Sequence, residues 1–223
     1  MTTTAIKYTS NATFTIPSGV SIIYVSMVAG GQAGSGAFTT YGGIGGTAGS
    51  AAINVPFPCT AGQVATIVVG AGGVGTSAPV NVGGQSGGDS SVTIGTSNVK
   101  SVGGSYYSTD PTWINSALGS PSFGWGGYPG DQTPNSYGAL KVYGRLAAPN
   151  GNEVPFAPFS KAGGGGGGTS WLGKGGVGGF KNNNPYGAGA GLVNTGAGGG
   201  GGGVSSSASP GGNGGSGCVI IEY

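Results

Sequence analysis

Short apolar or alternating stretches predict several β-strands along the chain. In Thr13–Ile16, Phe14 and Ile16 alternate with threonine, which is typical of a half-buried strand. Ser21–Val28 alternates less cleanly and is rich in β-branched residues, which favours a more buried strand. Further strands are expected at 51–55, 64–69, 91–94, 98–102 and 218–221, with a turn at Gly95-Thr96. Pro56 and Pro58 are expected to end the third strand.

Glycine-rich stretches lie between these strands. They occur near residues 30, 42, 70, 83, 163, 173, 187, 196 and 211. With 56 glycines and 13 prolines in 223 residues, the composition alone would favour disorder. Charged residues make up only 5%, however, whereas disordered chains are usually highly charged. Collagen is excluded because Gly30-Gly31-Gln32-Ala33-Gly34 breaks its three-residue repeat. We therefore expect ordered glycine segments.

Ordered glycine needs dense contacts, because glycine loses more backbone entropy on folding than any other residue. An extended helix of the polyproline II type has three residues per turn and no internal hydrogen bonds. Glycine lets such helices approach closely enough to bond to one another, which satisfies their backbone groups. We interpret the runs as a stack of short polyglycine II helices. Long, ordered β-loops are the alternative.

The amino-acid composition changes twice along the chain. We divide it into N-terminal strands with glycine segments (1–104), an aromatic, proline-broken insertion (105–162), and a glycine-rich tail with a closing strand (163–223). The tail is assigned to the same domain as residues 1–104. Residues 110–118 could hold about one helical turn, and no convincing amphipathic helix is found elsewhere.

Two glycine-rich stretches partly match the sequence motifs of nucleotide-binding sites. Residues 70–75 match the GxGxxG fingerprint, but the segment that follows has no helical period and contains Pro79. Residues 168–174 begin like a phosphate-binding loop, but Gly175 replaces the Ser or Thr that binds Mg²⁺. We predict no cofactor site.

Enzymatic chemistry has little support. The chain has no histidine, which removes serine triads and histidine metal sites. A carboxylate pair for glycan hydrolysis remains as the alternative, drawn from Asp89, Asp110, Asp131, Glu153 and Glu222. We predict that the protein is not an enzyme and has no catalytic or metal-binding residues.

The charge pattern and the apparent lack of targeting signals argue against two classes of partner, nucleic acids and membranes. The seven basic and five acidic residues are scattered, so nucleic-acid binding is not expected. The start of the chain does not read as a secretion signal, and no apolar run reaches 18 residues, so no membrane insertion is expected. Cys59 and Cys218 are expected to be buried free thiols rather than a disulfide.

Three stretches together resemble the glycine-rich domain of bacteriophage tail-fibre and adhesin proteins. They are Thr13–Val20 running through Tyr24–Gly31, Thr60–Gln63 through Val69–Gly75, and the ending Gly211–Tyr223. The resemblance covers about residues 12–104 and 163–223. It implies a mostly β fold: a β-sandwich-like framework with packed polyglycine II helices, long irregular loops and almost no α-helix.

The resemblance also implies a place on the exterior of a phage virion, after synthesis in the host cytoplasm. Other virion proteins would be partners. Some relatives present loops between glycine helices to bacterial receptors, so a receptor protein or glycan on the bacterial surface is expected. A purely structural role, as a head decoration, baseplate part or fibre cap, is the alternative. A homotrimer is left open.

Candidate receptor-binding residues come from the aromatic-rich part of the chain. Aromatics and arginine are the usual interface anchors, although they also form small cores. The candidates are Trp113, Trp125, Tyr128, Tyr143, Arg145, Trp171, Lys174 and Tyr186.

Overall fold

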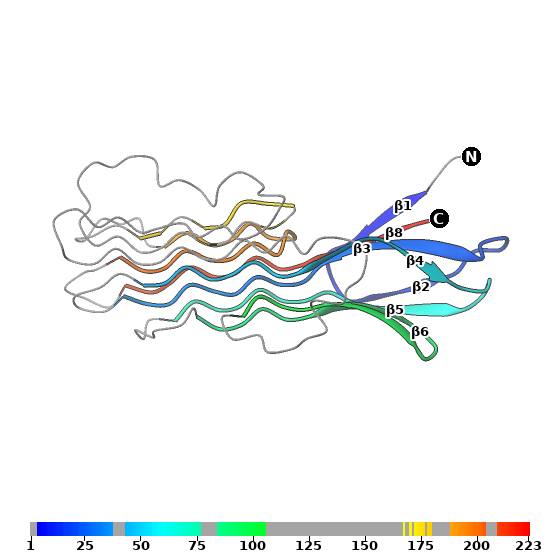
Figure 1. Ribbon diagram of the computed structural model, residues 1–223, viewed down its shortest axis with the longest axis horizontal. Coiled ribbons are helices and arrows are strands. Elements are labelled where there is room, and N and C mark those ends of the chain that lie inside the picture. The colour runs from blue at the N-terminus through cyan, green and yellow to red at the C-terminus, as the bar shows by residue number, and fades with distance from the viewer. Residues whose placement is uncertain are drawn as a thin grey trace.

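Two four-stranded antiparallel sheets form one end of the molecule (Figure 1). The computed structural model describes residues 4–37, 43–76, 84–105, 167, 170, 172–176, 178–179, 188–203 and 209–223. The first sheet has the order β1 (Ala5–Tyr8), β8 (Cys218–Glu222), β3 (Ile22–Val28) and β4 (Ala51–Pro58). The second has the order β2 (Ala12–Thr15), β5 (Val64–Val68), β6 (Ser90–Ile94) and β7 (Ser97–Ser101). The described residues contain no α-helix, so the predicted β fold is confirmed.

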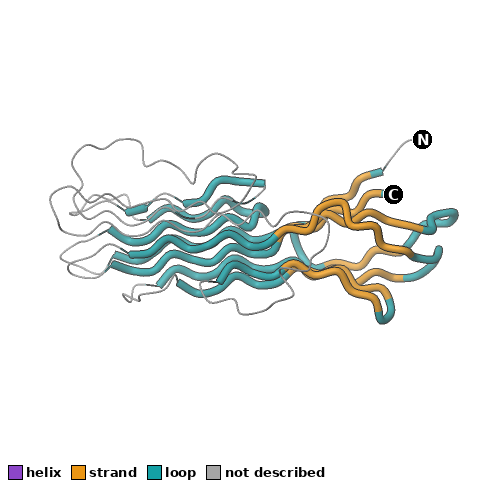
Figure 2. Tube along the Cα trace, viewed as in Figure 1, coloured by secondary structure: helices purple, strands orange, loops and turns teal. Residues whose placement is uncertain are grey.

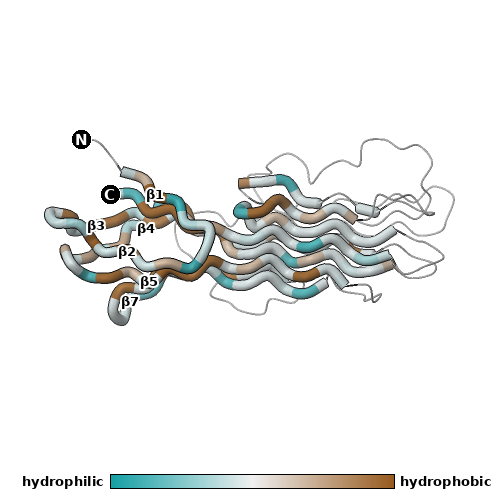
Figure 3. Tube along the Cα trace, turned by 180° about the vertical axis from the view of Figure 1, so that it is seen from behind, coloured by the Kyte–Doolittle hydropathy of each residue, from teal (hydrophilic) through white to brown (hydrophobic). Residues whose placement is uncertain are grey.

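The core lies between the two sheets and follows the alternation of the strands. Ile23, Val25 and Met27 of β3 face it from the first sheet, and Ile67 and Val92 face it from the second. Every second residue of a strand points to the same face, so one side of each sheet becomes apolar. Figure 3 shows the apolar residues concentrated in the strands, whereas the rest of the described chain is mostly pale, close to neutral in hydropathy, with a few apolar and polar positions.

Two expectations about the strands are corrected. β1 was not predicted, although Ile6 and Tyr8 alternate with polar or small residues and pack against the core. The expected stop at Pro56 is wrong, since β4 continues to Pro58.

The prolines fit because β4 is an edge strand. Cys59 donates its N–H to the carbonyl of Ser21, just before β3, at 3.0 Å. N–H groups alternate in direction along a strand, so the nitrogens of residues 56 and 58 point away from β3, where no bond is required.

The glycine segments continue the strands (Figure 2). Residues 29–37 follow β3, 70–76 follow β5 and 102–105 follow β7, while 43–50, 84–88 and 209–217 lead into β4, β6 and β8. They run side by side away from the sheets, joined by 172–176, 188–191 and 196–203. We call this set the glycine bundle. Its end farther from the sheets is the distal end.

Candidate functional site

Segment 29–37 is the centre of the glycine bundle, and its hydrogen bonds repeat every three residues. Ala29, Gln32 and Ser35 donate to residues 50, 47 and 44, while Gly31, Gly34 and Ala37 donate to residues 215, 212 and 209. The remaining partners come from 70–76, 84–88, 102–105 and 196–203, so six segments in all surround it. Three residues per turn, with bonds only to neighbours, is the polyglycine II arrangement. The predicted stack is confirmed.

The glycines are required because the backbones touch. A Cβ added to Gly34 would lie 1.9 Å from the carbonyl oxygen of Gly200, and one added to Gly72 would lie 2.0 Å from that of Gly214. Real Cβ atoms essentially never approach closer than 3.0 Å. Side chains are present only where there is space, as at the fully buried Ala33 and Ala197.

Gln32 is the largest side chain inside the bundle and bonds to two neighbouring segments. It is 2% exposed. Its Nε2 donates to the Gly84 carbonyl at 3.1 Å, and its Oε1 accepts from the N–H and the hydroxyl of Thr47 at 3.2 and 3.3 Å. The amide is thus satisfied although it is buried. Gln32 was not recognised from the sequence, where it is a single polar residue in a glycine run.

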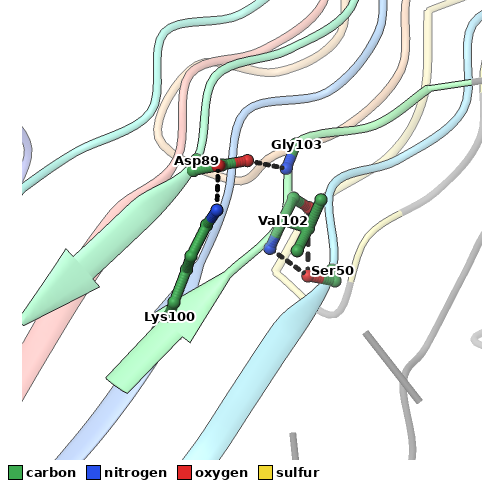
Figure 4. A network of polar contacts seen from close by, with 5 residues as sticks. All are labelled: Ser50, Asp89, Lys100, Val102 and Gly103. Carbon is green, nitrogen blue, oxygen red and sulfur yellow. Dashed lines mark hydrogen bonds and ion pairs between the residues drawn. The ribbon is translucent and has the colours of Figure 1, made fainter. Parts of the chain in front are cut away.

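Polar side chains hold the boundary between sheets and bundle. At this boundary the backbone changes from the two-residue repeat of a strand to the three-residue repeat of the glycine segments. The hydrogen-bond pattern of the sheet therefore cannot continue into the bundle. Ser90 Oγ donates to the Val28 carbonyl and accepts from the Gly70 N–H, both at 2.9 Å. In Figure 4, Ser50 Oγ bonds both backbone groups of Val102, at 2.6 and 3.0 Å.

Asp89 completes this boundary. Its Oδ1 accepts the Gly103 N–H at 2.8 Å, and its Oδ2 pairs with Lys100 Nζ at 2.6 Å (Figure 4). The carboxylate is therefore engaged in holding the chain after β7. Of the five carboxylates, Glu222 is also described and lies on β8, whereas Asp110, Asp131 and Glu153 lie outside the described residues.

The distal end brings together the ends of several segments. Ala37 N–H donates to the Ser209 carbonyl at 3.1 Å, and Gly43 N–H donates to the Gly202 carbonyl at 2.6 Å. Close by, Gly211 N–H donates to the Thr76 carbonyl at 3.0 Å. At the opposite end, Thr4 and Tyr223 exchange backbone hydrogen bonds at 2.9 and 3.1 Å. The described ends of the chain therefore lie at the sheet end, as Figure 1 shows.

Lys174 is the one predicted site residue that falls within the described part of the chain, and it is exposed. Its carbonyl accepts the Leu192 N–H at 3.5 Å. The other seven candidates (Trp113, Trp125, Tyr128, Tyr143, Arg145, Trp171 and Tyr186) lie outside the described residues and stay predictions.

The reactive groups of the described chain do not form a cluster. Within those residues, no group of three His, Cys, Asp or Glu side chains is placed to hold a metal ion. Both cysteines are free; Cys218 is buried, but Cys59 is only half-buried, which corrects that expectation. Burial raises the pKa of both thiols, and Lys7 opposes the effect at Cys218. Burial, and then the nearby Tyr223, raises the pKa of Tyr8.

A family model for a glycine-rich domain matches residues 4–223. The chain belongs to this glycine-rich domain family. The match spans the strands, the glycine segments and the stretch between them, whereas the residues that carried the resemblance covered less. No curated protein matches the chain. In the described residues, no helix is long and apolar enough to cross a membrane.

Proposed function

We propose that this glycine-rich domain protein is a phage virion surface protein, a tail-fibre or tail-tip adhesin. It binds a bacterial surface protein or glycan through loops on the glycine-rich scaffold. It is made in the host cytoplasm and is held on the particle by other virion proteins. The work is binding rather than catalysis.

The observation that carries this proposal is that both described ends of the chain lie at the same end of the molecule. The described ends of the chain, Thr4 and Tyr223, pair with each other at the sheet end. Attachment there would point the glycine bundle outward. The bundle is closely packed, which suits a rigid scaffold that carries binding loops.

Competition for host cells tests the proposal. Purified protein is added to host bacteria before the phage, and adsorbed phage are counted. Dose-dependent blocking by the parent protein, weakened in Trp113→Ala and Trp125→Ala variants that melt like the parent, is the expected result. If folded protein at saturating dose blocks nothing, the adhesin proposal is refuted.

A structural virion role is the second candidate, and the outer face of the first sheet favours it. Ile22 and Tyr24 of β3 are each 38% exposed. Their partners across the strands are Pro58 and Pro56, which are also exposed. Such a face suits a protein neighbour. Under this candidate, Tyr24→Ser would impair assembly of particles, while competition with host adsorption would be absent.

A further inference from the structure

The glycine run 198–203 is anchored differently from the other central segments. Segments 29–37, 43–50 and 209–217 continue directly into β3, β4 and β8, so the sheet fixes their position along the bundle axis. The run 198–203 begins instead after a turn at 193–196. All six of its glycines are buried.

The run carries no side chain that could define its register. Gly199 and Gly202 donate to the carbonyls of Gln32 and Ser35, each at 2.9 Å. In a helix of three residues per turn, sliding the run by three residues turns the same face toward each neighbour, and Gly201, Gly202 and Gly203 take the places of the first three glycines. The bond to Gln32 would then form from Gly202 instead of Gly199, and a run lengthened by three glycines would fill all six positions with glycine. The register must be set from outside the run.

The turn before the run is tied to the chain that leads into β8. Asn194 has a φ of 59°, in the left-handed region, and its N–H donates to Ser216 Oγ at 3.0 Å. Ser216 Oγ donates in return to Asn194 Oδ1 at 3.1 Å, and the Ser216 carbonyl accepts the Gly196 N–H at 2.8 Å. Ser216 lies two residues before β8, whose pairing with β3 is fixed by side chains in the core.

We propose that Asn194 and Ser216 form a register lock, which sets the position of the glycine run from its sheet end. The number of residues between Gly203 and Ser209, at the distal end, would then be free to change without moving the bundle. The proposal is independent of the adhesin function, since it concerns only the described bundle.

An insertion decides from which end the register is set. Three glycines are added after Gly203, and the scalar coupling across the hydrogen bond between the Gly199 nitrogen and the Gln32 carbonyl carbon is measured by NMR. With the lock at the sheet end, this coupling stays at Gly199, as in the parent. If the distal connection sets the register, the coupling moves to Gly202, and the proposal is overturned.

Removal of the Ser216 hydroxyl tests the lock itself. In the insertion background, Ser216→Ala is expected to give a second set of glycine resonances, with a coupling from Gly202 to Gln32. Ser216→Thr keeps a hydroxyl and should restore one set. Ser86→Ala, at an exposed serine of another glycine segment, is the control. A single set with Gly199 coupled in folded Ser216→Ala contradicts the lock. If that variant does not fold, the insertion variant alone decides.

Discussion

Gly34→Ala is the sharpest test of the packed glycine bundle. The new Cβ would lie 1.9 Å from the Gly200 carbonyl oxygen and 2.8 Å from the Gly201 nitrogen. Both atoms belong to the backbone of a buried segment, so no flexible side chain can move aside. Segments 29–37 and 196–203 would have to separate by about 1 Å or more to restore ordinary contact distances.

The expected loss of stability follows from what this separation breaks. The direct bonds from Gly199 to Gln32 and from Gly202 to Ser35 contribute about 1 kcal/mol each. Overpacking adds about 1–3 kcal/mol. Alanine offsets about 0.4–1 kcal/mol by restricting the unfolded chain. The net decrease in the free energy of unfolding is about 2–4.6 kcal/mol, or about 4–18 °C in Tm for a chain of this size.

Gly88→Ala is the matched control. Its Cβ would lie 3.1 Å from the Ala71 nitrogen, so the neighbour must give by only a few tenths of an ångström. We expect a change within about 1 kcal/mol. Calorimetric melting of the parent and both variants measures the difference. A Gly34→Ala variant that melts like the parent, or no lower than Gly88→Ala, would refute the reasoning.

Three further predictions concern the boundary and the pH dependence. Ser90→Ala should lower the free energy of unfolding by about 2–4 kcal/mol, because two buried backbone groups lose their partner. The control is Ser101→Ala, whose buried hydroxyl has no partner among the described residues and whose loss should change the free energy of unfolding by less than about 1 kcal/mol. Equal losses for the two variants in urea titrations would contradict this prediction. Asp89→Asn keeps an acceptor for Gly103 and should cost under about 1 kcal/mol, against about 1–2 kcal/mol for Asp89→Ala. The raised pKa of Cys218 keeps its thiol protonated in the folded state while the unfolded chain ionises near its ordinary value of 9.0, so stability should fall as pH rises above about 9. Unfolding from pH 7.5 to 10.5 should therefore show a steeper decline for the parent than for Cys218→Ala, and parallel curves would refute the assignment.

Strand positions could be predicted from the sequence because the pattern of apolar and polar side chains marks them. Phe14 and Ile16 alternate with threonine as the sheet faces require, and 21–28 is rich in the β-branched residues typical of a more buried strand. The extension of β4 over Pro56 could not be predicted, since it depends on β4 being an edge strand. β1 is short, and it is completed only by pairing with β8 at the other end of the chain.

The neighbours of each glycine segment could not be predicted, for a related reason. A glycine carries no side chain that distinguishes one partner from another, so the composition indicates a bundle but not its order. Segment 102–105 was missed because it reads as the end of a strand. As for the candidate site, Lys174 is exposed, and its role in binding stays a prediction, as do the roles of the other seven candidates.

The direction of the hydrogen bonds in the glycine bundle has a mechanical consequence. Segment 29–37 is about 28 Å long at about 3.1 Å per residue, and its bonds run sideways to six neighbours. A pull between the sheet end and the distal end therefore acts along the segments and strains these lateral bonds in shear, all at the same time. To extract one segment, most of its bonds must break together rather than one after another. The domain should resist tension along its axis far better than a force that peels one outer segment from its neighbours.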